Sequence, residues 1–350
     1  MKTKRKNNLS KTEELNFLND LIDQVLVIDK TKTICFANLN AKKRFGENIL
    51  DQNISSIIRD PELLDNIQKS LNDKSSSTID VETKKPNYQY YKVSVMPGPK
   101  NIFNAQETVI IFFKDFTDII KVQKLKSDFV ANVSHELRTP LQSIKMGLET
   151  INDGAAKNDK ENQKKIMPLI MQQAARMENI VNDLLSLSRI ELQEHIRPND
   201  NVVLDEIIKH SVDLHKDLLQ KNSITCKIET ENKNTEFKGD RNRLTEVFNN
   251  LIDNAIKYSE KNTKINILVK TNENNIDVII KDQGIGIPRE HIPKVTERFF
   301  RVNPEKSKEV GGTGLGLAIV KHIVNQHRGE IDISSEEGNG TQISLNFPKN

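Results

Sequence analysis

The chain has 350 residues, of which 36% are apolar, enough for roughly two to three domains with hydrophobic cores of their own. Lysine and arginine number 52 against 49 aspartates and glutamates, so the net charge of +3 excludes a general attraction to nucleic acid. The only two cysteines, Cys35 and Cys226, are too few for a disulfide framework or a zinc site. They are predicted to be buried and reduced.

The apolar runs are too short to cross a membrane. A spanning helix needs ~20 apolar residues, and the best candidate, Val109 to Phe113, has only the length of a strand. Residues 1–13 form a basic tail without the apolar centre of a signal peptide. We therefore expect a cytoplasmic protein whose membrane contact is at most peripheral, through attraction of this tail to anionic lipid.

Residues 14–120 mix short alternating runs with helical ones, which predicts a small antiparallel sheet with helices to one side. The expected strands are Val25–Asp29, Thr33–Ala37, Tyr88–Met96 and Thr108–Phe113, and the expected loops are Leu71–Ser77 and Pro97–Ala105. The segment resembles a PAS sensor domain, in which a strand, an asparagine-containing turn (here Ala37-Asn38) and short helices precede a long hairpin. It contains no histidine, which excludes haem ligation by histidine and leaves an apolar ligand or a dimer contact open.

The hydrophobic period becomes helical over residues 121–194. The first apolar stripe is Val122, Leu125, Phe129, Val133, Leu137, Leu141, Ile144, Leu148 and Ile151. A polar break from Asn152 to Gln163 precedes the second stripe, Ile166, Ile170, Ala174, Met177, Val181, Leu184 and Leu187. Two helices alone leave such stripes exposed, so pairing two helical hairpins into a four-helix bundle is expected, and with it a homodimer.

A polar linker at residues 195–201 contains Pro198, and an α/β pattern then fills residues 202–350. The expected helices are Asp205–Gln220, Asp240–Tyr258 and Leu315–Gln326. The expected strands are Ile224–Glu229, Lys264–Lys270, Ile276–Asp282, Glu330–Ser335 and Thr341–Phe347. This pattern predicts an α/β sandwich of one domain, and the chain as a whole is a multidomain α+β protein.

His135 lies close to opposite the buried stripe of its helix and is predicted to face solvent. A lone surface histidine is usually without function, but Glu136 can accept a hydrogen bond from Nδ1 and leave Nε2 as a nucleophile. Thr139 follows one turn later, and Pro140 removes the amide that would bond the Glu136 carbonyl, so the helix should be soft or bent here.

Residues 134–141, Ser-His-Glu-Leu-Arg-Thr-Pro-Leu, resemble the H box of sensor histidine kinases. The resemblance implies that His135 is autophosphorylated, that Glu136 serves as the base, and that Thr139 positions water for phosphatase chemistry. Arg138 completes the expected catalytic set.

Two glycine-rich segments suggest a nucleotide pocket. Asp282-Gln-Gly284-Ile-Gly286 ends a predicted strand, where a buried carboxylate can accept from an adenine amino group and glycines admit the ring. The second segment precedes an apolar helix whose free amides suit phosphate oxygens, and it contains Gly312, Thr313, Gly314, Leu315 and Gly316. It is not a P-loop, because no Gly-Lys-Ser/Thr follows.

One helix carries Asn250 and Asn254 a single turn apart, as two amide oxygens must lie to meet a metal ion and a triphosphate together. Lys257 can reach a phosphate, and Tyr258 could line the adenine side. Asparagine in mid-helix costs propensity and so asks for a reason, although the whole chain is rich in asparagine.

Together these segments resemble the N, G1, F and G2 boxes of the ATP-binding domain shared by histidine kinases, gyrase, Hsp90 and MutL. The F box is Glu297 to Arg301, with Phe299 as a site residue, and Val302 to Val310 would be a mobile lid. The resemblance implies a Bergerat-type sandwich that binds ATP and Mg²⁺, with Asn250 and Asn254 as metal ligands. Gyrase-like relatives place a hydrolytic glutamate at the position of Asn250, so this base is absent.

The sequence therefore resembles a two-component sensor histidine kinase. Such a protein would phosphorylate His135 with ATP and pass the phosphoryl group to an aspartate of a response regulator, and phosphatase activity is expected as well. Residues 292–302 and 312–322 look most like the phosphate-regulon sensor kinases, which suggests phosphate-starvation signalling. The alternatives are an ATPase of the same superfamily and a non-kinase scaffold or phosphatase. The signal, the partner regulator, the kinase-to-phosphatase balance and transfer in cis or in trans stay open.

Overall fold

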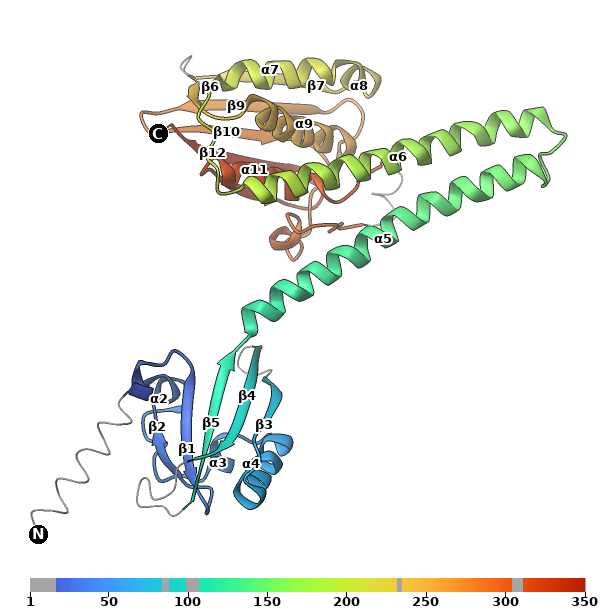
Figure 1. Cartoon of the computed structure of the whole chain (residues 1–350). Coiled ribbons are helices and arrows are strands. Elements are labelled where there is room, and N and C mark those ends of the chain that lie inside the picture. Colours follow the sequence, from blue (N-terminus) through green and yellow to red (C-terminus); the bar gives the residue numbers. More distant parts are fainter. Residues whose placement is uncertain (1–16, 84–87, 99–106, 232–234, 304–310, 350) are drawn as a thin grey trace, which may run out of the picture. The chain divides into compact units, whose positions relative to one another are not determined.

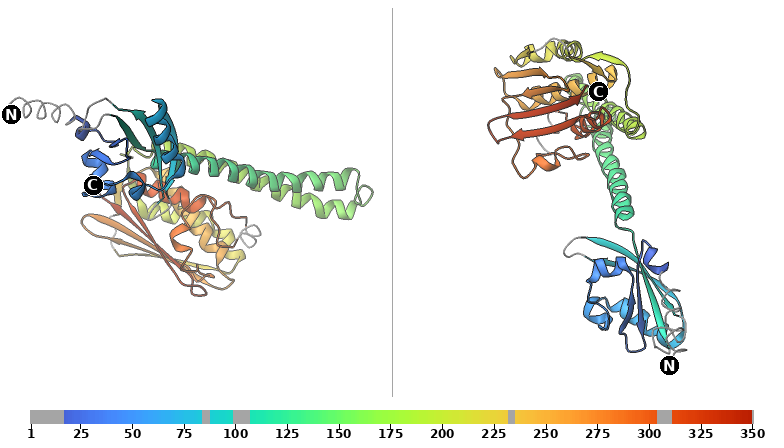
Figure 2. Two further views of the ribbon diagram at one scale, coloured as in Figure 1. Left: turned by 90° about the horizontal axis from the view of Figure 1, so that it is seen from below. Right: turned by 90° about the vertical axis from the view of Figure 1, so that its left-hand side faces the viewer.

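The computed structural model describes residues 17–83, 88–98, 107–231, 235–303 and 311–349 (Figures 1 and 2). It divides into two compact units, residues 1–128 and 129–350. The predicted basic tail and most of the predicted lid, residues 304–310, lie outside the described residues.

The N-terminal unit contains a five-stranded antiparallel sheet in the order β2-β1-β5-β4-β3. Its strands are β1 (Gln24–Asp29), β2 (Ile34–Ala37), β3 (Ser77–Thr83), β4 (Gln89–Pro97) and β5 (Thr108–Asp115). The predicted sheet is present, but the loop expected at residues 71–77 is confined to residues 74–76, and strand β3 was not predicted. A helix ends there and β3 begins, and this edge strand carries only two apolar residues, Ile79 and Val81, too few for a clear alternating signal.

The 3₁₀ turn η1 (Phe17–Asp20) precedes β1, and the helices between β2 and β3 pack beside the sheet. They are α2 (Leu39–Phe45), α3 (Ile54–Ile57) and α4 (Pro61–Asp73). Helix α4 packs on β3, β4 and β5 through Leu63, Ile67 and Leu71, which recur every fourth residue and so share one face.

The side chain of Asn38 is fully buried and is hydrogen-bonded at both ends. Its Oδ1 accepts from the amides of Val25 (3.0 Å) and Ala41 (2.9 Å), and its Nδ2 donates to the carbonyls of Leu18 and Asp23 (both 2.9 Å). Asn38 thus caps α2 and ties it to β1 and η1, which explains why an asparagine stands at the predicted turn.

The predicted helical hairpin is present as α5 (Thr117–Asn152) and α6 (Lys160–Gln193), which run antiparallel (Figure 1). Helix α5 begins four residues before the predicted position, because Asp115 accepts a hydrogen bond from the Thr117 amide (2.8 Å). Helix α5 continues through Pro140. Asp159 starts α6 by accepting from the amides of Glu161 and Asn162 (3.0 and 3.1 Å).

The hairpin leaves a set of large apolar side chains exposed. They are Leu141, Met146, Leu148, Met167, Leu169, Met171, Val181 and Leu185. A dimeric four-helix bundle would bury these side chains against the hairpin of a second protomer. The homodimer itself stays a prediction.

The C-terminal sheet has the order β11-β12-β10-β9-β7, in which only β7 runs parallel to its neighbour β9. The strands are β7 (Thr225–Thr230), β9 (Lys264–Thr271), β10 (Asn275–Lys281), β11 (Glu330–Ser335) and β12 (Thr341–Pro348). Helices α7 (Leu204–Leu214), α8 (Lys216–Lys221), α9 (Arg241–Tyr258) and α11 (Gly316–Gln326) form the second layer over one shared core (Figure 1). The predicted strands are confirmed, with ends that differ by one residue.

Two features of this unit differ from the sequence analysis. The helix predicted at residues 205–220 is divided into α7 and α8 at His215, whose Nδ1 lies 2.8 Å from the Ser211 carbonyl. The short strands β6 (Asn201–Val203) and β8 (Glu236–Lys238) pair as a separate sheet. Three residues are too few to produce a periodic signal.

Both cysteines are free, and both are half-buried rather than fully buried as predicted. They lie on strands β2 and β7, where one face of each strand is only partly covered. Burial raises the pKa of the Cys226 thiol to about 11, so this thiol is protonated at neutral pH.

His327 follows α11, is 1% exposed, and links α11 to the start of α9. Its Nδ1 lies 2.7 Å from the Ile323 carbonyl, and its Nε2 accepts a hydrogen bond from the Asp240 amide (3.0 Å). Nε2 can accept only while the ring is neutral, and burial lowers the pKa of His327 accordingly.

We expect this group to make folding stability depend on pH. Because the folded pKa is below the unfolded value of about 6.5, the stability is complete above pH ~6.5 and falls as the pH decreases toward the folded pKa, by at most ~1.4 kcal/mol per pH unit. Urea titrations at pH 7.5, 6.5 and 5.5 measure the slope. The His327→Gln variant should lose this part of the slope, whereas His210→Gln, at an exposed position, should retain it. Identical slopes in His327→Gln and wild type would contradict the assignment.

Candidate nucleotide pocket and phosphoacceptor helix

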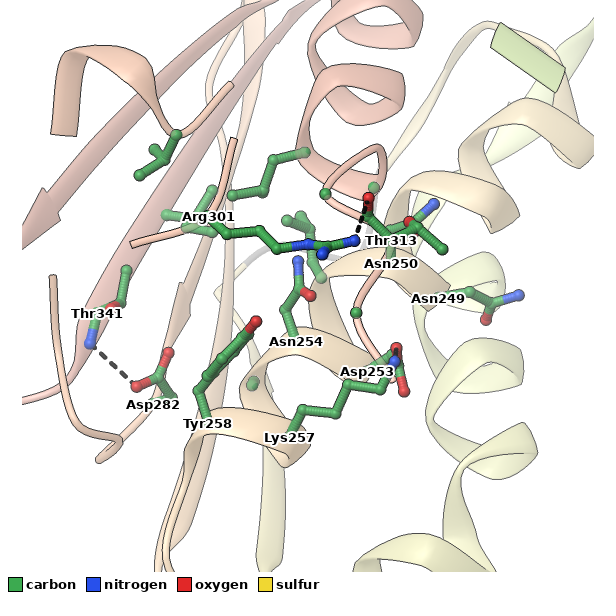
Figure 3. Close-up of a pocket in the computed structure, with 18 of the residues that line it drawn as sticks. Asn249, Asn250, Asp253, Asn254, Lys257, Tyr258, Asp282, Arg301, Thr313 and Thr341 are labelled. Atoms are coloured by element: carbon green, nitrogen blue, oxygen red, sulfur yellow. Dashed lines mark hydrogen bonds and ion pairs between the residues drawn. The ribbon is translucent and has the colours of Figure 1, made fainter. Parts of the chain in front are cut away.

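A cavity of about 620 Å³ lies in the C-terminal unit, bordered by α9, β10, the segment before α11 and helix α6 (Figure 3). Most predicted nucleotide-binding residues line it: Asn250, Asn254, Lys257, Tyr258, Asp282, Gly286, Gly312, Thr313, Gly314 and Gly316. Val302 and Asn303, from the beginning of the predicted lid, also line it. A volume of this size is typical of small-molecule and cofactor sites.

Helix α9 presents its polar face to this cavity because its other face is buried. Asp240 caps α9, and the buried residues are Leu244, Val247, Phe248, Leu251, Ile252, Ala255 and Ile256. The Asn250 amide group donates to the Glu246 carbonyl (2.9 Å). Lys257 forms an ion pair with Asp253 (2.6 Å), so it must exchange this partner to reach a ligand.

The Oδ1 atom of Asp282 accepts from the amides of Gly284 (2.8 Å) and Thr341 (3.0 Å), and Figure 3 shows the second bond. Among the described residues Oδ2 has no partner, so it is the oxygen left for a ligand donor. Burial raises the pKa of Asp282, and the two hydrogen bonds oppose that rise. Gly284 does not line the cavity: a Cβ there would lie 2.6 Å from the Tyr258 carbonyl, so this glycine permits close contact with the end of α9.

Hydrogen bonds hold the segment before α11 around Thr313. The Arg301 guanidinium donates to the Thr313 carbonyl (2.9 Å, Figure 3), and the Leu315 amide donates to the Thr313 hydroxyl (3.2 Å). A Cβ on Gly316 would lie 2.7 Å from Asn250 Oδ1, so glycine at this position permits a close approach to the Asn250 side chain. This arrangement brings the beginning of α11 next to the predicted metal ligand.

Phe299 and Leu315 do not line the cavity, although the sequence analysis placed them at the site. Leu315 is fully buried in the core. The backbone of Phe299 lies against the loop, since a Cβ on Gly314 would lie 2.9 Å from it. The Phe299 ring packs at a tilt against that of Phe129, with centroids 5.9 Å apart. Both are therefore structural supports of the pocket.

His135 is exposed on α5 as predicted, and Arg138 is exposed as well. The Thr139 hydroxyl donates to the His135 carbonyl (3.3 Å). The expected hydrogen bond between Glu136 and the His135 ring is wrong for this arrangement. The Glu136 carboxylate binds Arg301 in bidentate fashion (2.9 and 3.2 Å) and lies 3.5 Å from Arg176. Neighbouring residues on a helix point about 100° apart, so Glu136 faces these arginines while His135 faces solvent.

The sequence analysis missed the contribution of α6 to the cavity. Asn179, Asn182 and Asp183 line its wall, and the Thr313 hydroxyl donates to Asp183 (2.7 Å). Burial raises the pKa of Asp183. No local signal marks this residue, since a polar position beside the apolar stripe is usual on any solvated helix face.

Further contacts join the hairpin to the C-terminal layers. Ser186 on α6 bonds to Glu246 and Arg243 on α9, and Arg298 pairs with Glu191. The Arg298 guanidinium also lies 5.4 Å from the centre of the Phe129 ring. Helix α5 from Phe129 onward, helix α6 and the cavity thus belong to one compact unit.

The two predicted metal ligands, Asn250 and Asn254, both line the cavity. Within the described ranges, no three histidine, cysteine, aspartate or glutamate side chains gather in a way that could bind one. The amide group of Asn250 already donates to the helix, which leaves its Oδ1 as the ligand atom, and Asn254 lines the same wall. Amide and phosphate oxygens together suit Mg²⁺.

Over the part of the chain that the structure describes, none of the helices is both long and apolar enough to cross a bilayer.

Comparison with known proteins decides the family. Residues 125–193 match the His Kinase A (phospho-acceptor) domain, and residues 239–350 match the histidine kinase-, DNA gyrase B-, and HSP90-like ATPase family. The phosphate regulon sensor protein PhoR of Pseudomonas aeruginosa is 30% identical over 330 residues, which cover 93% of this chain and 72% of that protein. The chain belongs to the sensor histidine kinases.

Other relatives of this histidine kinase include the sensor protein kinase WalK of Staphylococcus aureus strain Newman. It is 32% identical over 338 residues, which cover 95% of the chain, and the chain spans about half (54%) of the length of that relative. The structure of histidine kinase ThkA in complex with response regulator protein TrrA shares the fold, with 24% identity, a TM-score of 0.51, and coverage of 94% and 96%. The Acinetobacter baumannii histidine kinase AdeS has 27% identity, a TM-score of 0.51, and coverage of 62% and 98%.

Proposed function

We propose that this protein transfers the γ-phosphoryl group of ATP to Nε2 of its own His135 and then to an aspartate of a response regulator. The observation that carries the proposal is that an exposed histidine and a nucleotide-sized cavity belong to one compact unit. Asn250 stands where gyrase-like hydrolases have their glutamate, so bound ATP would persist until the histidine attacks.

The residues of the pocket divide the work of nucleotide binding. Asp282 accepts a hydrogen bond from the adenine amino group through Oδ2, and Gly286 permits the close contact with the backbone of Glu336 at this side of the pocket. The backbone amides of residues 312–314 and 316, with Lys257 and Arg301, donate hydrogen bonds to the phosphate oxygens at the beginning of α11. Asn250 and Asn254 would hold Mg²⁺, which would neutralise phosphate charge.

During the transfer, the bond between Nε2 and the γ-phosphorus forms as the bond from that phosphorus to the bridging oxygen breaks and ADP leaves. The Nδ1 proton must then be accepted by a base. Glu136 can serve only after it leaves Arg301 and Arg176, so the structure corresponds to a resting arrangement. In a separate phosphatase reaction, Thr139, one turn after His135, would position the water that attacks the aspartyl phosphate of the regulator, and inorganic phosphate would leave.

We further propose a homodimer built on the exposed apolar face of the hairpin defined above. The partner is a receiver domain, a proposal supported by the structure of ThkA, which was determined in complex with a response regulator protein.

We assign residues 14–120 to a PAS-like sensor domain, 121–194 to dimerisation and phosphotransfer, 195–201 to the linker and 202–350 to ATP binding. The five-stranded antiparallel sheet of the N-terminal unit supports the first assignment. A cytoplasmic location and a role in phosphate-starvation signalling belong to the same proposal.

The test uses the full chain incubated with Mg²⁺ and ATP labelled at the γ-phosphate. We expect a protein adduct that is labile in acid and stable in alkali, on the peptide that contains His135, with little free phosphate. Free phosphate without an adduct would favour an ATPase. Dephosphorylation of a regulator without either would favour a scaffold or phosphatase. Phosphotransfer to each receiver domain of the source organism in turn would then identify the partner, and a regulator unrelated to phosphate control would contradict that role.

A further inference from the structure

The hairpin already occupies two donors of the nucleotide cavity. The Thr313 hydroxyl and the Arg301 guanidinium both line the cavity, and either group could donate hydrogen bonds to a phosphate oxygen. In the structure each binds a carboxylate of the hairpin instead. Thr313 donates to Asp183 on α6 (2.7 Å), and Arg301 donates to Glu136 on α5 (2.9 and 3.2 Å). Carboxylates therefore stand where an anionic ligand would find its partners.

Of the two carboxylates, Asp183 and Glu136, only Asp183 is among the described residues that line the cavity. Burial raises its pKa, and the nearby carboxylates of Glu246 and Asp253 act in the same direction, while Thr313 and Lys257 oppose them. An environment of this kind already disfavours negative charge. A triphosphate would add several more negative charges to the same wall.

We propose that Asp183 and the nucleotide phosphates compete for Thr313, so that a triphosphate must displace α6 from the segment before α11. The inference rests on the proposed function, because it assumes that the cavity binds ATP. Asp183 is a positioning residue here: it acts on the nucleotide through the hydroxyl of Thr313 and through its own charge.

The coupling works in both directions. If the contact between Asp183 and Thr313 weakens triphosphate binding, then triphosphate binding weakens that contact by the same factor. The Arg301 guanidinium bridges Thr313 and Glu136, so a change at Thr313 reaches the neighbour of His135 directly. Entry of ATP would thus release the hairpin at two carboxylates and return Glu136 to the phosphoacceptor histidine.

The test compares nucleotide affinities of the full chain and of Asp183→Asn, measured by calorimetric titration with ATP, ADP and adenosine, with and without Mg²⁺. Asparagine can still accept from Thr313 but carries no charge. We expect ATP to bind about tenfold more tightly, ADP to gain less, and adenosine to gain nothing, because the repulsion scales with phosphate charge. The matched control is Glu178→Gln, which removes an exposed carboxylate of the same helix that is not among the described residues lining the cavity. It should leave all three affinities unchanged.

Equal gains for all three ligands, no gain, or weaker binding of ATP with Mg²⁺ in Asp183→Asn would overturn the competition; the last result would make Asp183 a contributor to the metal site. Asp183→Ser, checked for folding by thermal unfolding, should follow the same order and guards against a folding defect in one variant. If the wild-type chain binds no nucleotide, the proposed function fails and the inference with it. If it binds ATP but the selectivity for charge is unchanged in the variants, only the inference fails.

Discussion

Replacing His135 with glutamine is expected to abolish the acid-labile phosphoprotein, with at least a ~1000-fold loss of label. Glutamine fills a similar volume but has no ring nitrogen with a lone pair to attack phosphorus. The position is exposed on α5, and glutamine is a good helix former, so the fold should be unaffected. The measurement is incorporation of γ-labelled phosphate into the purified full chain over a fixed time.

Two controls make this result specific. His210→Gln, which replaces an exposed histidine on α7, should incorporate label at the wild-type rate. His135→Gln should bind ATP with wild-type affinity, because His135 is not among the described residues that line the cavity. Label that persists in His135→Gln would show that another residue accepts the phosphoryl group and would remove the central assignment.

Features with a local period could be predicted from the sequence. The alternation in β9, β10 and β12 predicts strands because alternate residues of each strand face one core. The stripes of the hairpin predict helices by their spacing, although several of their members, such as Leu141 and Val181, are exposed. The pocket could be predicted from the sequence for a similar reason. Asn250 and Asn254 are one turn apart, and each glycine segment adjoins a strand or a helix, so topology alone brings them to one cavity.

Contacts between distant parts of the chain could not be predicted. Glu136 and Arg301 are 165 residues apart, and Asp183 and Thr313 are 130 apart. Each looks like an ordinary solvated charge or hydroxyl in its own segment, and only the packing of α5 and α6 against the pocket gives it a partner. The predicted hydrogen bond from the His135 ring to Glu136 is absent for this reason. Glu136 instead accepts two charge-assisted hydrogen bonds from Arg301, which is distant in the sequence.

The second large effect is expected for Gly286→Ala, at the point where two turns of the pocket meet. A Cβ on Gly286 would lie 2.0 Å from the Glu336 carbonyl, and a Cβ on Gly340 would lie 2.2 Å from the Asp282 carbonyl. The Gly338 amide also donates to the Ile285 carbonyl (2.7 Å). Both clashes are with backbone atoms, so the turns must separate to admit a methyl group, and Asp282 then loses its bond to the Thr341 amide.

We expect Gly286→Ala to lower the free energy of unfolding by ~2–4 kcal/mol, from the positive φ of 69° together with the clash, and to weaken ATP binding by at least ~100-fold. Gly338→Ala is the matched control, since it has a φ of 83° but open space around its Cβ. It should cost only ~1 kcal/mol and leave ATP affinity near that of the wild type. Denaturant unfolding and calorimetric titration of both variants decide the matter. If Gly286→Ala bound ATP as well as Gly338→Ala does, contact between the two turns would not be what holds Asp282 in place, and the adenine side of the pocket would need a different support.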